Sequence, residues 1–206
     1  MIEQQIRPWG VSDPALLTLL TVVKREQFVP EYVRALAFAD TELPLPDGQN
    51  MLPPKTEARL VQALALAPHE HVLQIGTGSG HVAALLAHCA AQVISVEISP
   101  VLLRFAHANL ARSGIHNVEL VQGNAAQGWP GQYDAICLCA SLPVIPRTLL
   151  DQLKIGGRLV VFIGEAPVMQ AQCITRRTQH DYTTLSLFET LVTPLMLATQ
   201  PSHFIF

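Results

Sequence analysis

The residues best suited to bind a ligand are three closely spaced glycines in the run GTGSG (76–80). The apolar run HVLQI (71–75) precedes them and VAALLAHCA (82–90) follows, so the pattern predicts a buried strand, a glycine loop and a helix. Glycines let the backbone turn sharply and approach a ligand closely. In parallel sheets, nucleotides bind in the crevice beyond the carboxyl ends of the strands. We therefore predict a nucleotide-type ligand at this loop.

The spacing of the glycines and a downstream carboxylate narrow the choice of ligand. A dinucleotide site needs the spacing GxGxxG, and here His81 occupies the position of the third glycine. The spacing GxGxG suits S-adenosyl-L-methionine, which becomes S-adenosyl-L-homocysteine when it gives up its methyl group. Glu97 ends the next predicted strand, QVISVE (92–97), where a carboxylate can accept hydrogen bonds from ribose hydroxyls. The alternatives are a purely structural turn and an ordinary exposed acid at a strand end.

A third predicted strand, NVELVQG (117–123), is followed by Asn124, where the adenine of such a cofactor would lie. The Asn124 amide can bond the edge of the base, but an asparagine after a glycine is also a common turn residue, and both interpretations stay open. His81 either touches the cofactor or closes the pocket. The complete predicted cofactor site consists of Gln74, Gly76, Thr77, Gly78, Ser79, Gly80, His81, Glu97, Ile98, Asn124 and Ala125.

The elements that position these residues alternate between strand and helix from residue 71 onward. Further strands are predicted at 133–140 and 158–164, with helices at 100–114 and 148–153. Two more strands, at 172–178 and 183–191, surround His180-Asp181 and predict a hairpin. The fold class is therefore α/β and Rossmann-like: a mainly parallel seven-stranded sheet with helices on both faces and an antiparallel C-terminal hairpin. This is the layout of class I methyltransferases.

The N-terminal third reads as a helical cap. Ser12-Asp13-Pro14 is a helix start signal, a second helical piece covers about 30–38, and LVQALAL (60–66) has helical spacing. The prolines and Asp-Gly of LPLPDG (43–48) predict a loop between them. We predict one domain over 1–206, with N-terminal helices and a substrate loop in 1–68 and the cofactor-binding core in 69–206.

Composition and charge exclude several classes of function. The net charge is −3 without a basic patch, which argues against a nucleic-acid or membrane partner. The start of the chain lacks an apolar targeting segment, and the four cysteines form no CxxC pair, so we expect a cytoplasmic protein. His69 and His71 flank Glu70 without a third candidate ligand, and we predict no metal site.

Seven segments, taken in order, resemble the protein-L-isoaspartate O-methyltransferase family over about residues 3 to 195: EQQIRPWGVSD, KREQFVP, LPLPDGQ, VLQIGTGSGH, VISVEIS, GWPGQYDAI and LLDQLKIGGRLVVFIG. The resemblance implies that a protein or peptide carboxylate, that of a damaged L-isoaspartyl residue, accepts the methyl group. The ester then collapses to a succinimide, which allows repair. The sequence gives no indication of the oligomeric state.

The substrate loop departs from the family pattern. The family's loop typically reads like GQTISQP, and its serine faces cofactor and substrate, whereas this chain has Gln49, Asn50, Met51 and Leu52. Leu52 takes the place of the serine and cannot donate a hydrogen bond. Gln74 and Asn124 stand where the family usually has acids. We expect weak or absent methylation of isoaspartyl peptides. The alternatives are a catalytically degenerate cofactor-binding or interaction protein, or a methyltransferase with a different acceptor.

Overall fold

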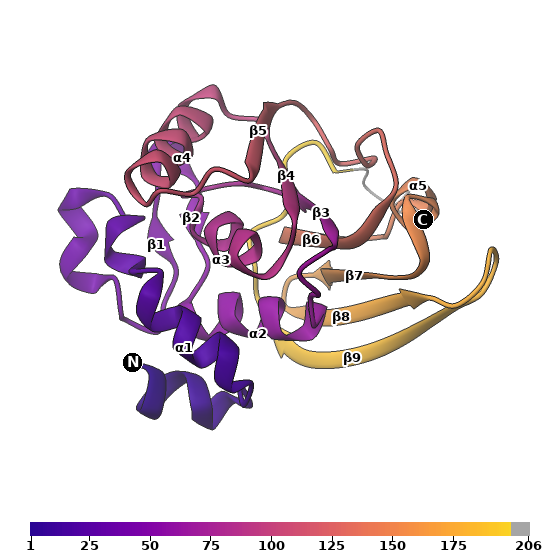
Figure 1. Ribbon diagram of the computed structural model, residues 1–206, viewed down its shortest axis with the longest axis horizontal. Coiled ribbons are helices and arrows are strands. Elements are labelled where there is room, and N and C mark those ends of the chain that lie inside the picture. The colour runs from indigo at the N-terminus through magenta and orange to yellow at the C-terminus, as the bar shows by residue number, and fades with distance from the viewer. Residues whose placement is uncertain (199–206) are drawn as a thin grey trace, which may run out of the picture.

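The computed structural model describes residues 1–198, which are arranged around a large central sheet (Figure 1). Its seven strands have the order β5-β4-β3-β6-β7-β8-β9. They are parallel from β5 to β7 and antiparallel from β7 to β9. Their bounds are β3 His71–Ile75, β4 Gln92–Glu97, β5 Val118–Gln122, β6 Tyr133–Leu142, β7 Leu153–Glu165, β8 Val168–Arg176 and β9 Tyr182–Thr190. The predicted fold class is confirmed.

The order of the parallel strands creates a crevice at the end of β3. The chain runs outward from β3 to β4 and β5, and then returns to place β6 on the other side of β3. Ligands of open α/β sheets bind at such a reversal of strand order. The glycine loop that follows β3 therefore lies where the topology leaves room for a ligand.

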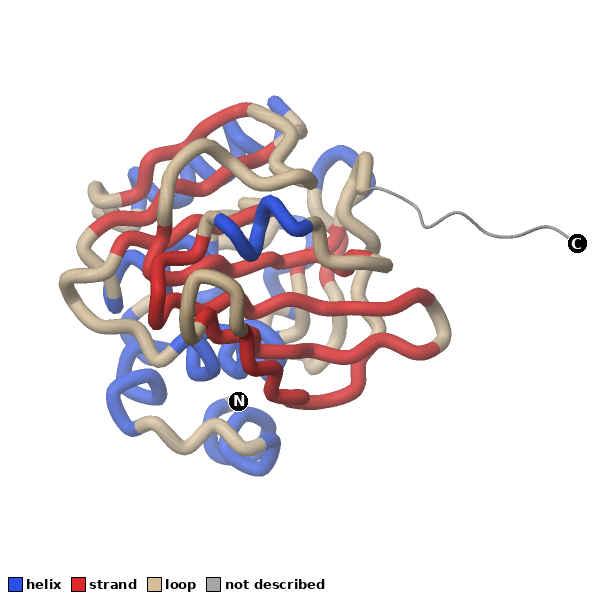
Figure 2. Tube along the Cα trace, turned by 90° about the vertical axis from the view of Figure 1, so that its right-hand side faces the viewer, coloured by secondary structure: helices blue, strands red, loops and turns tan. Residues whose placement is uncertain are grey.

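Helices cover the two faces of the sheet to different extents (Figure 2). Residues of α1 to α4 pack with Val72, Val93 and Val160 on one face, whereas α5 contributes Leu149 to the core on the other face. Side chains of Asp13 and Ser99 cap the starts of α1 and α4. The helices are α1 Pro14–Val22, α2 Pro54–Leu64, α3 His81–Cys89, α4 Pro100–Arg112 and α5 Arg147–Asp151.

The N-terminal segment differs in detail from the predicted helical cap. A π-helix covers Ile2–Ile6, and 3-10 helices cover Arg7–Trp9, Arg25–Gln27, Glu31–Leu36 and Pro46–Gly48. The predicted helix at 30–38 is thus a 3-10 helix. Within Glu31–Leu36 only Val33 is buried, which gives little apolar contact to stabilise an α-helix.

The predicted loop at 43–48 begins a small hairpin. Strands β1 Leu43–Pro44 and β2 Asn50–Met51 pair antiparallel, and the 3-10 turn joins them. The Leu45 N–H also donates to the Gln49 carbonyl at 2.7 Å. Strands of two residues give no sequence signal, because a period of two needs several residues to show.

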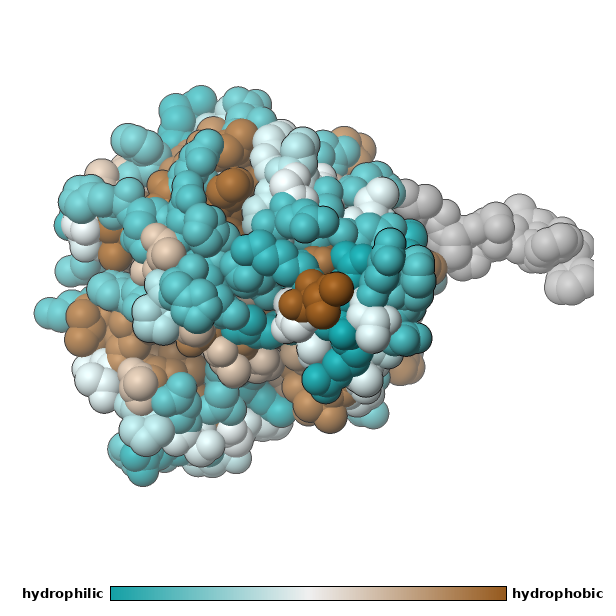
Figure 3. Space-filling model, turned by 45° about the vertical axis from the view of Figure 1, so that its right-hand side comes forward, coloured by the Kyte–Doolittle hydropathy of each residue, from teal (hydrophilic) through white to brown (hydrophobic). Residues whose placement is uncertain are grey.

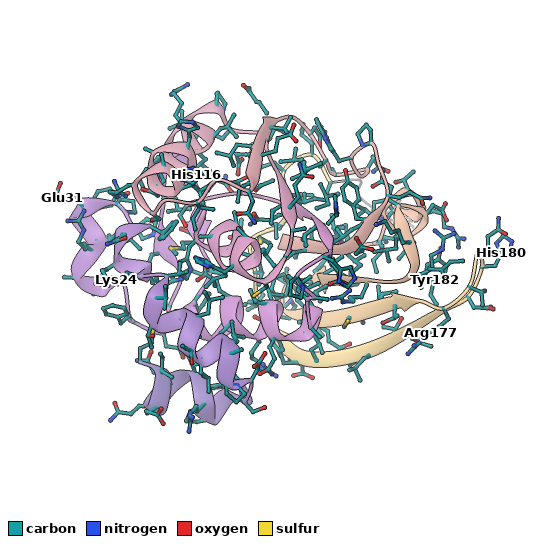
Figure 4. The ribbon with its side chains drawn as sticks, viewed as in Figure 1. Lys24, Glu31, His116, Arg177, His180 and Tyr182 are labelled. Atoms are coloured by element: carbon teal, nitrogen blue, oxygen red, sulfur yellow. The ribbon has the colours of Figure 1, made fainter. Side chains whose placement is uncertain are left out.

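The C-terminal hairpin was predicted around His180-Asp181, and β8 and β9 form it. The Arg177 N–H donates to the Asp181 carbonyl at 2.8 Å across the turn. Arg177 and His180 lie at one end of the molecule, far from Lys24 and Glu31 of the N-terminal segment (Figure 4). Strand β8 begins earlier than predicted because Val168 pairs with Glu165 at the end of β7, and β7 begins earlier because Leu153 pairs with Tyr133 of β6.

The N-terminal segment shares the core of the sheet. Ile6, Val11 and Leu16 belong to the same buried cluster as Val72 and Phe162. The division into a cap over 1–68 and a core over 69–206 stays a prediction, and its last residues, 199–206, lie outside the described part of the chain. Within that part no helix is both long and apolar enough to cross a membrane. Polar residues dominate the face drawn in Figure 3, with hydrophobic patches between them.

Candidate functional site

The glycine loop has a backbone that other residues adopt with difficulty. Gly76, Gly78 and Gly80 have φ values of 84°, 56° and 84°, in the left-handed region. The Gly76 N–H donates to the carbonyl of Val96 at 3.0 Å, which joins the start of the loop to β4. The loop can therefore present main-chain groups to a ligand without side chains in the way.

A buried polar network supports the loop from below. The Ser95 hydroxyl donates to Gln74 Oε1 at 2.8 Å and lies 2.7 Å from Thr77 Oγ1. Gln74 Nε2 donates to the Gly76 carbonyl at 3.3 Å. These side chains are all buried. A neutral amide suits this position, because a carboxylate would place a second acceptor against the carbonyl of Gly76.

Glu97 is fixed in place at the end of β4. Its Oε2 accepts from the Gly78 N–H at 2.9 Å, and its Oε1 accepts from the Ser99 N–H at 3.0 Å. The residue is only 6% exposed, so the alternative of an ordinary exposed acid is wrong. A carboxylate has about four acceptor sites, so both oxygens can still accept from ribose hydroxyls.

A cavity lies above the loop, with about 880 Å³ of empty space including its open mouth. Its walls bring together Gln49, Asn50, Met51, Leu52, Gln74, Gly76, Thr77, Gly78, Ser79, Glu97, Ile98, Asn124 and Ala125. The predicted cofactor residues and the predicted substrate loop thus face one shared space. The glycine loop without bulky side chains, the fixed carboxylate of Glu97 and the size of the cavity together fit S-adenosyl-L-methionine.

Two residues of the predicted cofactor site do not line the cavity. Gly80 is the residue before α3, and a Cβ there would come within 3.3 Å of Ala106, so its role is close packing. His81 is 2% exposed, and its ring meets Phe28 edge-on at 5.2 Å. As the first residue of α3 it turns away from the cavity, and its Nδ1 lies 2.7 Å from Glu57.

Asn124 acts as a turn residue. It is exposed, and its Oδ1 accepts from the Ala126 N–H at 2.9 Å. The bond closes the turn after β5 and explains the asparagine without a ligand. Contact between its amide and the adenine edge stays a prediction.

The substrate loop is tied down on both sides. Asn50 Nδ2 donates to Glu42 Oε2 at 3.0 Å, so its amide is already engaged. Burial raises the pKa of Glu42, and the hydrogen bond from Asn50 partly opposes that rise. Leu52 is 6% exposed, and its carbonyl accepts from an Arg25 NH2 at 2.7 Å. The loop therefore presents an aliphatic side chain where the family pattern has a hydroxyl.

Sequence reasoning missed one wall of the cavity, formed by the segment 192–196. Ser141 of β6 holds this segment: its N–H donates to Thr193 at 3.0 Å, its hydroxyl donates to Val192 at 3.0 Å, and its carbonyl accepts from Leu195 at 2.8 Å. No motif marks the segment, because only the folded sheet brings it to β6. Glu42, Glu57 and Cys139 also line the cavity and were not predicted.

Across residues 1–198 the structure contains no group of three or more His, Cys, Asp or Glu side chains that could hold a metal ion.

Comparisons with known proteins agree on one family. Residues 1–197 match the family "Protein-L-isoaspartate(D-aspartate) O-methyltransferase (PCMT)". The chain is 40% identical over 199 residues to "Protein-L-isoaspartate O-methyltransferase 2" of Marinobacter nauticus, which covers 95% of this chain and 91% of the relative. It is 43% identical over 166 residues to "Protein-L-isoaspartate O-methyltransferase" of Methanoculleus marisnigri, at 80% and 76% coverage.

Solved structures show the same fold. A beta-aspartate methyltransferase from Plasmodium falciparum, in complex with S-adenosyl-L-homocysteine, aligns with a TM-score of 0.79 at 23% identity, covering 93% of this chain and 95% of that one. A protein-L-isoaspartate O-methyltransferase aligns at 0.80 with 26% identity, covering 92% and 63%. Since the sequence match runs through both the substrate loop and the glycine loop, this chain belongs to the protein-L-isoaspartate (D-aspartate) O-methyltransferase family.

Proposed function

We propose that this protein transfers the methyl group of S-adenosyl-L-methionine to the carboxylate of an L-isoaspartyl residue in a protein or peptide. One observation carries the proposal. The glycine loop with Glu97 and the substrate loop Gln49–Leu52 line the same cavity, so donor and acceptor would meet inside it. The family and its relatives, which bear the name of this activity, support the choice of acceptor.

The reaction needs little acid–base catalysis from the protein. A carboxyl group has an unperturbed pKa of about 4, so it is already an ionised nucleophile at neutral pH. S-adenosyl-L-methionine would supply an electrophilic methyl group on a sulfonium. The tasks left to the chain are to orient the ribose through Glu97, to hold the remainder over the glycine loop, and to exclude water around the acceptor.

Leu52 should make this transfer slow. An acceptor carboxylate entering beside Leu52 loses water and gains no side-chain donor there. The nearby amide of Asn50 already donates to Glu42. If the missing bond is one made in the transition state, its loss costs about 1.5 to 3 kcal/mol, or about ten- to a hundredfold in rate. The main-chain N–H groups of the loop and the amide of Gln49, which lines the cavity, are the remaining donors.

Glu42 favours a second candidate, a methyltransferase with a different acceptor. Its carboxylate lines the cavity next to the substrate loop and would repel a carboxylate acceptor when ionised. A neutral or cationic acceptor would meet no such repulsion. Both candidate enzymes bind the cofactor, and so would a protein without catalytic activity. Cofactor binding alone therefore does not distinguish between these three functions.

We place the activity in the cytoplasm, with protein or peptide acceptors and without a nucleic-acid or membrane partner. The four free cysteines support a reducing compartment. The net charge of −3 supports an acceptor other than nucleic acid.

The test uses purified protein and two peptides that differ only in containing isoaspartate or aspartate. Calorimetric titration first establishes cofactor binding, and labelled methyl transfer then measures turnover. We expect binding, with slow, base-labile labelling of the isoaspartyl peptide alone. Cofactor binding without labelling of either peptide would exclude the isoaspartyl acceptor, and equal labelling of both would exclude selectivity for it; either result would favour the second candidate.

A further inference from the structure

A buried polar cluster connects the substrate loop to the helix after the glycine loop. It consists of Arg25, Glu57 and His81, whose side chains are each about 2 to 3% exposed. Arg25 comes from the N-terminal segment, Glu57 from the first turn of α2, and His81 from the start of α3. The cluster therefore joins three segments that are distant in sequence.

Arg25 distributes its donors over three acceptors. Its Nε donates to the Ala37 carbonyl at 2.8 Å, and one NH2 donates to the Leu52 carbonyl at 2.7 Å. The other terminal nitrogen forms an ion pair with Glu57 Oε2. The planar guanidinium is suited to this, because its five N–H groups point in fixed directions, whereas a lysine offers one point charge.

Glu57 and His81 complete the link to the donor side. The same Glu57 oxygen lies 2.7 Å from His81 Nδ1, within hydrogen-bond distance. His81 follows the glycine loop directly, and Glu57 itself lines the cavity. The main chain of the acceptor loop is thus joined through three side chains to the first turn after the donor loop.

The cluster is an inefficient way to stabilise a fold. Burial lowers the pKa of Arg25, against the opposing effect of Glu57, which shows that the charged guanidinium is desolvated. His81 Nε2 is buried and has no hydrogen-bond partner among the described residues. Apolar replacements of buried ion pairs are often as stable as the pair. A role in holding a particular geometry explains the cluster better than a contribution to stability.

We propose that Arg25 is a positioning residue for methyl transfer, which fixes the main chain of the substrate loop at Leu52 relative to the glycine loop, with Glu57 and His81 holding its guanidinium. This rests on the proposed function. The loop has no side-chain donor at position 52, and the donors that it keeps, its main-chain N–H groups and the Gln49 amide, take their direction from how its main chain is held. Loss of the cluster should therefore impair the acceptor step and leave the cofactor site intact.

Three variants separate positioning from folding. Arg25→Lys keeps the charge and removes the fork. The triple variant Arg25→Met, Glu57→Leu, His81→Phe replaces the cluster by apolar side chains of similar size. The matched control is Arg158→Lys, because Arg158 likewise donates to main-chain carbonyls, those of Leu64, Ala65 and Asp134, and pairs with a glutamate, Glu70, away from the cavity.

The readouts are thermal unfolding, cofactor Kd, kcat/KM for an isoaspartyl peptide, and hydrogen exchange of the amides in 49–52. We expect both cluster variants to lose about ten- to a hundredfold in kcat/KM and to exchange the loop amides about tenfold faster, while cofactor Kd changes less than about twofold. Arg158→Lys should change neither kcat/KM nor loop exchange.

A folded triple variant with wild-type loop exchange would overturn the proposal, whatever its activity. An equal loss in Arg158→Lys would show a general effect of stability and would overturn it too. If the wild type methylates no isoaspartyl peptide, the proposed function fails, and hydrogen exchange with cofactor titration still decides whether the cluster positions the loop.

Discussion

Removal of the Glu97 carboxylate should separate cofactor binding from the rest of the fold. The side chain accepts one main-chain N–H at each oxygen, from Gly78 and from Ser99, and lines the cavity with its remaining acceptor sites. Glu97→Ala deletes all of these contacts. Glu97→Gln keeps the volume and one acceptor oxygen, but its amide NH2 faces a main-chain donor.

These contacts determine how far Kd and Tm should change. A hydrogen bond to a charged group contributes about 1.5 to 3 kcal/mol, so loss of the ribose contact should raise Kd about ten- to a hundredfold. Since the Gly78 N–H also loses its acceptor, we expect the rise in Kd for Glu97→Ala to lie near the upper end of this range. The Kd of Glu97→Gln should lie between those of Glu97→Ala and the wild type. The two lost main-chain bonds should lower Tm by about 4 to 8 °C, at about 1 kcal/mol each.

Calorimetric titration with S-adenosyl-L-homocysteine provides the assay, with Glu119→Gln as control because Glu119 is an exposed glutamate on the neighbouring strand β5. The control should bind as the wild type does. Unchanged affinity in a folded Glu97→Ala variant would remove Glu97 from the site and refute the assignment of the ribose to this carboxylate.

Three further outcomes follow from the structure. Gln74→Glu should lower Tm, because a carboxylate oxygen would replace the amide that donates to Gly76; an unchanged Tm would contradict the role of that bond. Burial opposes a fall in the pKa of Glu70, but hydrogen bonds led by Arg158 outweigh it and the pKa is lowered. The ionised Glu70 therefore stabilises the fold at neutral pH, and this contribution is lost as the pH falls through the pKa of Glu70 in the folded protein. In urea, Glu70→Gln should be less stable than the wild type at neutral pH, and the difference in stability should shrink in acid. Glu42→Gln should raise kcat/KM for isoaspartyl peptides, most clearly above the burial-raised pKa of Glu42, and a gain that is equal at all pH values would argue against charge repulsion.

The parts of the fold that follow from local pattern were predictable. Strand–helix alternation from residue 71 led to the parallel sheet, because each strand is an apolar run bounded by turn residues. The same holds for the glycine loop and for Glu97, since their positions at strand ends place them at one edge of the sheet. Capping by Asp13 was also visible, because its signal is local.

What could not be predicted depends on contacts between distant segments. His81 follows the glycines directly, which suggested contact with the cofactor, yet the first turn of α3 points its ring at Glu57 and Phe28. The wall at 192–196 exists because Ser141, about 50 residues earlier, bonds its main chain. A one-dimensional pattern contains neither the direction of a side chain at a helix start nor a pairing of this kind.

A single-turnover assay with Leu52→Ser shows whether the missing hydroxyl limits methyl transfer. With saturating cofactor and an isoaspartyl peptide, we expect slow transfer by the wild type and a gain of about tenfold or more in Leu52→Ser, because the hydroxyl restores a donor beside the acceptor carboxylate. Leu52→Ala is the matched control, since it opens the same space without a donor, and it should show no such gain. Rapid transfer by the wild type, or equal rates in Leu52→Ser and Leu52→Ala with cofactor binding intact, would show that the lack of a hydroxyl at position 52 does not limit the reaction.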